Sequence, residues 1–182
     1  MAVANVFVAF LALDNLRVFG TPLLGDVIQL ETHYYYALLA LLLPLAFLIY
    51  RSNRKFDLFP MDVMLALMSL GICAWLFGHS EAMLDEGWEF SAPETAVWMS
   101  LGLWVLVLEA VRRAAGLSLF VLVSVVSVYP LVADMMPAAI SGMASSLSGA
   151  AAYHAMSSES LLGLPFRAFA NLVIGFLVLG IA

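Results

Sequence analysis

Of the 182 residues in this chain, 64% are hydrophobic and 11% are charged, and the mean hydropathy is +1.04. A soluble domain of this length has no core large enough to bury so much apolar surface, so we expect an integral membrane protein in a lipid bilayer. The net charge of -6 excludes a nucleic-acid partner, and the single cysteine, Cys73, excludes an intrachain disulfide.

Apolar segments follow one another along the chain, each close to the length of about 20 residues that a helix needs to cross a bilayer. They show no period-two strand pattern, and lipid-exposed backbone must form its hydrogen bonds within its own segment. The expected fold class is therefore all-α: a polytopic transmembrane helical bundle with about five or six hydrophobic segments. The segments cover residues 2–13, 34–50, 61–78, 96–111, 117–136 and 166–182.

The first segment is short for a full span, so residues 2–13 form either a short or tilted span or an interfacial helix. The second is bounded by Tyr34, Tyr35 and Tyr36 at one end and Tyr50 at the other. Aromatic rings of this kind are typical of the two headgroup levels, and they predict where the second helix meets them.

Basic residues orient the bundle. The ends of the second to fifth segments on one side hold five of the seven Lys and Arg residues: Arg51, Arg54, Lys55, Arg112 and Arg113. An excess of Lys and Arg predicts the cytoplasmic side. The loop over residues 80–95 carries acidic residues and no base, which predicts the opposite side, and residues 138–165 form an outside connection.

Glu109 is the one carboxylate clearly inside an apolar segment, where a lone charge is costly unless it is paired. Arg112 and Arg113 follow three and four residues later, at spacings that bring side chains together on a helix. Glu109 either forms a local ion pair that reaches the interface, or docks with one arginine against a neighbouring helix or subunit. Both interpretations make these residues candidates for packing rather than for chemistry.

Two further carboxylates are weaker candidates. Asp62 opens the third segment, where the helix dipole and nearby bases stabilise a negative charge. Asp134 lies between Pro130 and Pro137 and is expected at the outer interface, with an ion-coupling role as the alternative.

The histidines do not predict a cofactor. His33 and His79 stand at segment ends and His154 in a polar connection, whereas a haem or chlorophyll ligand would lie at mid-membrane depth. A pigment held near the surface by His33 or His79 is the alternative. The sequence shows no catalytic triad, zinc-protease motif or phosphate loop, so we expect no enzyme, no cofactor and no metal site.

Three stretches in order resemble a known family: Glu109 to Gly116, then Tyr129-Pro130 with Pro137, then Ser158 to Pro165. They look like the fused membrane component of tripartite ATP-independent periplasmic (TRAP) transporters, closest to the branch with TAXI-type binding proteins. The resemblance covers roughly residues 29–182.

The resemblance implies three parts. Residues 1–113 are similar to the small four-helix permease part, 114–137 to a connecting transmembrane helix, and 138–182 to an outside connection and the first segment of the large permease part. In this family the small part is a scaffold in the bacterial inner membrane, while the large part carries the sodium and substrate sites.

A fused permease continues well beyond Ala182, so the chain is expected to be the scaffold portion of a sodium-coupled transporter for organic acids and not transport-competent alone. Its expected partners are a large permease part or other integral membrane subunits, and a periplasmic substrate-binding protein. The alternative is an accessory or assembly subunit of another integral membrane complex, of energy metabolism or photosynthesis, derived from such a permease.

Overall fold

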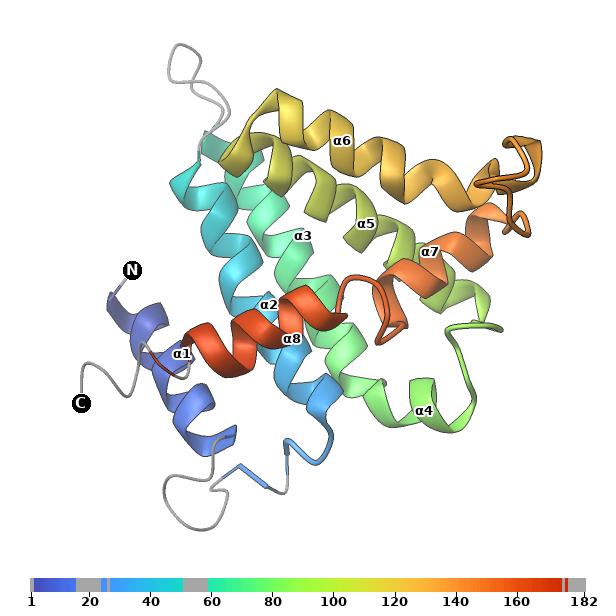
Figure 1. Ribbon diagram of the computed structural model, residues 1–182. Coiled ribbons are helices and arrows are strands. Elements are labelled where there is room, and N and C mark those ends of the chain that lie inside the picture. Colours follow the sequence, from blue (N-terminus) through green and yellow to red (C-terminus); the bar gives the residue numbers. More distant parts are fainter. Residues whose placement is uncertain (1, 16–23, 26, 51–58, 175, 177–182) are drawn as a thin grey trace.

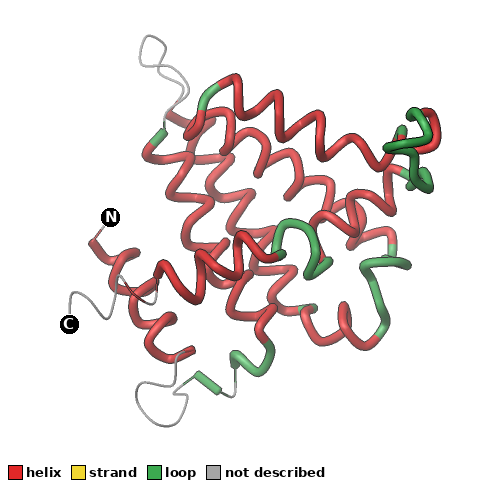
Figure 2. The backbone as a smooth tube through the Cα atoms, in the orientation of Figure 1, coloured by secondary structure: helices red, strands yellow, loops and turns green. Residues whose placement is uncertain are grey.

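The computed structural model describes residues 2–15, 24–25, 27–50, 59–174 and 176. Within these ranges the regular elements are helices and helical turns, with no strand (Figure 2). The predicted all-α fold class is confirmed.

Three long helices form the centre of the bundle: α2 (Glu31–Ile49), α3 (Phe59–Gly78) and α5 (Glu94–Ala115). They lie side by side in Figure 1, and each is long and apolar enough to cross a membrane. These helices match the second, third and fourth predicted segments. Their shared core contains large side chains that are almost fully buried, among them Leu38, Phe47, Cys73, Leu76 and Leu103.

Buried serines in this core satisfy their hydroxyl groups within their own helices. Ser69 donates to the carbonyl of Ala66 (2.9 Å), and Ser100 donates to the carbonyl of Ala96 (2.7 Å). A hydroxyl that donates to a carbonyl of the preceding turn keeps a hydrogen bond when it is buried, so its burial in an apolar interior leaves no donor unsatisfied. These polar positions are therefore compatible with helix packing in a membrane.

The chain turns from α5 into α6 (Leu117–Val128) at Gly116, whose φ of +87° is a conformation that side chains with a Cβ rarely adopt. The fifth segment was predicted as one helix to Met136, but α6 ends at Val128. The ring of Pro130 supplies no N–H to continue the helix, and the chain goes on as two 3₁₀ turns, η1 (Tyr129–Leu131) and η2 (Ala133–Met135). The resulting apolar helix is shorter than a full crossing.

Two helices lie where the sequence predicted only loops. The short α4 (Ser80–Asp85) follows α3, and α7 (Leu147–Met156) lies along α5 inside the stretch expected to be an outside connection (Figure 1). Ser146 caps α7 by accepting a hydrogen bond from the backbone N–H of Gly149 (3.1 Å). The alanines of α7 are buried, because their small side chains let two helix backbones approach closely.

The ends of the described chain lie near each other beside α2 (Figure 1). The helix α1 (Ala2–Asn15) contacts α2, and α8 (Leu164–Ala168) continues into a π-helical turn over Phe169–Val173. The sixth predicted segment begins within α8, and its last residues lie outside the described part of the chain.

Candidate functional site

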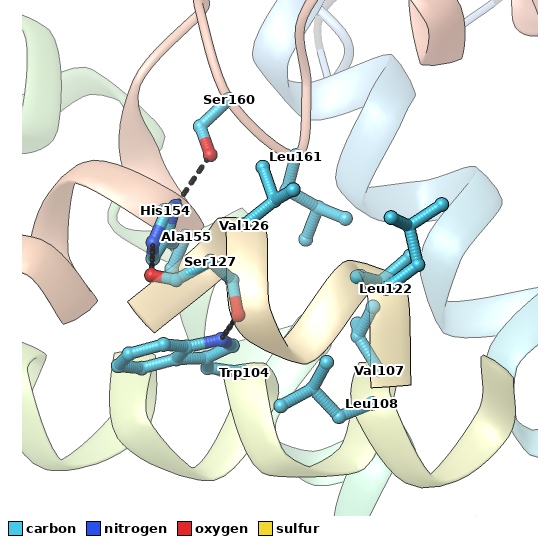
Figure 3. A pocket seen from close by; sticks show the side chains of 11 residues that line it. Trp104, Val107, Leu108, Leu122, Val126, Ser127, His154, Ala155, Ser160 and Leu161 are labelled. Carbon is cyan, nitrogen blue, oxygen red and sulfur yellow. Dashed lines mark hydrogen bonds between the residues drawn. The ribbon is translucent and has the colours of Figure 1, made fainter. Parts of the chain in front are cut away.

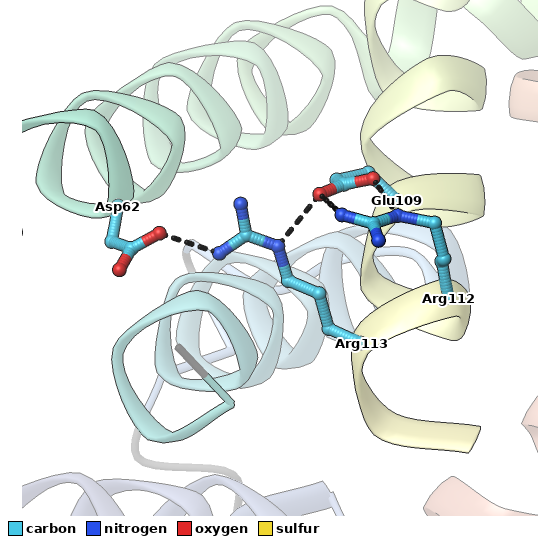
Figure 4. Close-up of polar contacts among 4 residues, drawn as sticks. All are labelled: Asp62, Glu109, Arg112 and Arg113. Atoms are coloured by element: carbon cyan, nitrogen blue, oxygen red, sulfur yellow. Dashed lines mark hydrogen bonds and ion pairs between the residues drawn. The ribbon is translucent and has the colours of Figure 1, made fainter. Parts of the chain in front are cut away.

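Four charged side chains form an ionic cluster between α3 and α5 (Figure 4). The Arg113 guanidinium bonds Asp62 on α3 through Nη1 (2.6 Å to Oδ1) and Glu109 on its own helix through Nε (2.7 Å to Oε1). Arg112 binds both oxygens of Glu109, each at 2.7 Å. We call Asp62, Glu109, Arg112 and Arg113 the ionic cluster.

Burial differs sharply across the ionic cluster. The side chains of Arg113 and Asp62 are 3% and 2% exposed, whereas those of Glu109 and Arg112 are 26% and 40% exposed. The Arg113 guanidinium also lies 5.2 Å from the centre of the Phe47 ring on α2, within cation–π range. One buried arginine therefore joins α2, α3 and α5, and the two carboxylates balance the two guanidinium charges.

The ionic cluster combines the two interpretations of Glu109. Arg112 forms the local pair at the more exposed edge, while Arg113 docks against a neighbouring helix. The structure places Asp62 at the start of α3, as the sequence indicates, and there it binds the distant Arg113. The other predicted basic residues, Arg51, Arg54 and Lys55, lie outside the described residues. Asp134 is exposed in η2.

The three consecutive tyrosines are buried within the structure, and that they mark a headgroup level stays a prediction. Tyr34, Tyr35 and Tyr36 are 1%, 3% and 0% exposed. Buried tyrosines need partners for their hydroxyls, and these tyrosines find them on segments far along the chain. Only Tyr50, at the other end of α2, is exposed as a belt residue would be.

Each of these tyrosines forms a hydrogen bond with a residue of the C-terminal region. Tyr36 donates to the carbonyl of Ala155 at the end of α7 (2.9 Å), and Tyr34 donates to the carbonyl of Ala170 in the π-helical turn (3.0 Å). The hydroxyl of Tyr35 accepts a hydrogen bond from the Asn171 amide (3.1 Å). We call Tyr34, Tyr35 and Tyr36 the tyrosine row; it ties the start of α2 to α7 and to the segment after α8.

An ion pair strengthens this attachment at the surface. Arg167 of α8 binds Glu31 at the start of α2 (2.6 Å), and Tyr35 donates to the same carboxylate oxygen (3.2 Å). The amide of Asn15 in α1 reaches Asn171 (3.3 Å). The first helix and the C-terminal segment therefore meet at the same end of α2.

No protein-family model, curated protein or solved structure matches this chain. The resemblance to TRAP permeases thus rests on the three sequence stretches alone. The ionic cluster and the tyrosine row have one chemical property in common. Their polar groups bind other groups of this chain, and these contacts fix helices in place.

A third polar group lies beside a cavity of about 380 Å³ between α5, α6 and α7 (Figure 3). His154 of α7 contacts the carbonyl of Ser127 through Nε2 and the hydroxyl of Ser160 through Nδ1, both at 2.8 Å. The indole N–H of Trp104 donates to the Ser127 hydroxyl (3.2 Å). The sequence places His154 in a polar connection and does not reveal these contacts. Its partners come from other elements, and no local spacing in the sequence brings them together.

The other two histidines lie in aromatic surroundings. His33 is buried with its ring 4.9 Å from that of Phe77, and His79 stacks on Trp75 at 4.0 Å. Among the described residues, no group of three or more His, Cys, Asp or Glu side chains could hold a metal ion.

Proposed function

We propose that this chain is the membrane scaffold portion of a sodium-coupled TRAP-type transporter for organic acids, and that it does not transport by itself. One observation carries the scaffold role: the buried charges Arg113 of α5 and Asp62 of α3 bind each other between helices. Ionisable residues on a transport path face a cavity or pore. Here Arg113 and Asp62 are almost fully buried against each other, and among the described residues neither cavity beside α6 is lined by Asp, Glu, Lys or Arg.

A scaffold for a moving domain has to keep its own helices fixed, and α2 is fixed at both ends. The ionic cluster reaches it near its last turn, through the ring of Phe47. The tyrosine row holds its first turns to α7 and to the C-terminal segment. Both contacts join segments distant in sequence, so they resist sliding of one helix along another.

The surface of α6 supports contact with a further membrane component. Every residue of α6 is at least partly exposed, and all of them except its serines are apolar. The TRAP-like order of segments places this helix between the scaffold and the large permease part. In the proposed arrangement the chain is a multi-pass protein of the bacterial inner membrane, the ionic cluster lies at the cytoplasmic end, and the chain is not an enzyme.

Uptake by the complete permease tests this proposal. The permease that contains this chain would be reconstituted in proteoliposomes with its binding protein, with and without residues 1–113, and supplied with an organic acid and a sodium gradient. We expect the deletion to abolish uptake while the binding protein keeps its affinity for the acid. Undiminished uptake by the shortened permease would overturn the scaffold role.

The second candidate is an accessory or assembly subunit of another integral membrane complex. The exposed apolar surface of α6 favours it equally, since any membrane partner could cover that surface. Purification of the native complex in mild detergent, followed by mass spectrometry of its subunits, separates the candidates. A large permease or a periplasmic binding protein supports the transporter, and a redox or pigment complex supports the accessory subunit.

A further inference from the structure

We propose that the cavity between α5, α6 and α7 binds a neutral amphiphile: a single acyl chain whose head group carries a hydroxyl. This proposal is independent of the transporter assignment. The cavity of about 380 Å³ falls within the range of roughly 300–1,000 Å³ that is usual for ligand pockets. Its walls are mainly apolar side chains, among them Val107, Leu108, Leu122, Val126 and Leu161 (Figure 3).

The volume fits one chain. An apolar cavity of about 150 Å³ is known to accommodate benzene, which has six carbons, so 380 Å³ has room for about fifteen carbons. Two side chains of the α6 wall, Leu122 and Val126, are largely exposed. The cavity is therefore open at α6, beside the membrane-crossing helix α5, where acyl chains of the bilayer can enter.

The polar end of the cavity has a fixed arrangement of protons. A carbonyl can only accept, so His154 Nε2 carries a proton and donates it to the carbonyl of Ser127. In the neutral tautomer that has its proton on Nε2, Nδ1 accepts from the Ser160 hydroxyl. The Trp104 indole donates to the Ser127 hydroxyl, which in turn donates to the carbonyl of Ser124 (3.2 Å).

Each of the four polar hydrogens in this group is therefore already donated. What remains is acceptor capacity, in particular the lone pairs of the hydroxyl oxygen of Ser160, one of the residues that line the cavity. A ligand hydroxyl can donate to these lone pairs. A carboxylate or phosphate would meet oxygen lone pairs without a donor, and the described lining residues include no Lys or Arg to balance its charge.

Photo-crosslinking of the purified full chain in detergent tests the proposal. Two probes share one acyl chain with a diazirine near its end: a monoacylglycerol, which ends in hydroxyls, and the fatty acid, which ends in a carboxylate. We expect the monoacylglycerol to label peptides from α6 and residues 157–163 about tenfold more than the fatty acid does, because an unmatched polar group costs roughly 1–3 kcal/mol.

Two variants fill the cavity from two different elements, Leu122→Trp on α6 and Leu161→Trp on the turn after α7. Each is expected to reduce monoacylglycerol labelling to about a tenth, because a close-packed interior leaves no room for a chain. Val121→Trp is the matched control: Val121 is an exposed neighbour on α6 outside the cavity lining, and its variant should label as the wild type does.

Size-exclusion chromatography identifies any variant that fails to fold, and the other filling variant then decides. Equal labelling by both probes would overturn the assignment of the head group. Labelling that persists in the folded filling variants, or no labelling of the wild type, would overturn the cavity site.

Discussion

The replacement Arg113→Gln tests the ionic cluster most severely. It removes the guanidinium that binds the buried Asp62 carboxylate, which is 2% exposed, while Glu109 keeps both of its bonds to Arg112. Breaking a buried ion pair by removing one partner costs about 3–5 kcal/mol, because the remaining buried charge loses that partner's compensation. The loss of the contact between the guanidinium and the Phe47 ring adds to this cost.

The chain offers a matched control next to the test residue. Arg112→Gln also removes one positive charge from the ionic cluster, but Arg112 is 40% exposed and binds only the half-buried Glu109 among the residues of the cluster. A pair of this kind contributes roughly 0.2–1 kcal/mol. The two substitutions therefore separate a buried contact between helices from a local, partly solvated one.

Thermal unfolding of the detergent-solubilised chain measures both variants. At about 2–4 °C per kcal/mol for a protein of this size, Arg113→Gln should lower the midpoint by roughly 6–20 °C and Arg112→Gln by less than about 4 °C. The double variant Asp62→Asn with Arg113→Gln should regain part of the loss, since it no longer buries the Asp62 charge. Equal midpoints for the two single variants would refute the reasoning.

Three other predictions concern a buried hydrogen bond, a turn and the role of Glu109. Tyr36→Phe leaves the buried carbonyl of Ala155 without its hydroxyl partner, so the free energy of unfolding should fall by about 1–3 kcal/mol and α7 should become easier to proteolyse, whereas Tyr50→Phe, at an exposed site, should change neither. Gly116→Ala forces a side chain into a backbone with φ of +87° and should cost about 1–3 kcal/mol of stability; Gly71→Ala, inside α3 where a new Cβ meets open space, should be neutral or stabilising by up to about 1 kcal/mol. Denaturant titration of both glycine variants gives the comparison, and equal effects would contradict the role of Gly116 in the turn. Glu109→Gln should reduce the amount of folded protein recovered in detergent, because Arg112 and Arg113 lose their shared carboxylate; full recovery would contradict a packing role.

The sequence predicts the central helices well, because hydrophobic length is a property of each segment by itself. It fails for α7, since alanine, serine and glycine are equally common in loops and in closely packed helices. It also misses the end of α6. The apolar run continues past Pro130 and predicts a longer helix, whereas the proline ends it.

The candidate site is predictable only as far as its contacts are local. The spacing of Glu109 and Arg112 indicates their pair directly, whereas the pair of Arg113 and Asp62 joins residues 51 positions apart. The tyrosine row shows the same limit: in sequence, a buried tyrosine looks like an interfacial one. The carbonyl partner of Tyr36 is 119 positions away and becomes evident only when α7 is placed against α2.

The scaffold proposal holds that the charges of the central helices serve packing and not ion coupling. Its most direct test is the sodium dependence of uptake by the complete permease carrying Glu109→Gln, measured in proteoliposomes and expressed per assembled complex. The account predicts fewer assembled complexes with an unchanged sodium dependence. A shifted sodium dependence in a variant that assembles in full amount would contradict it.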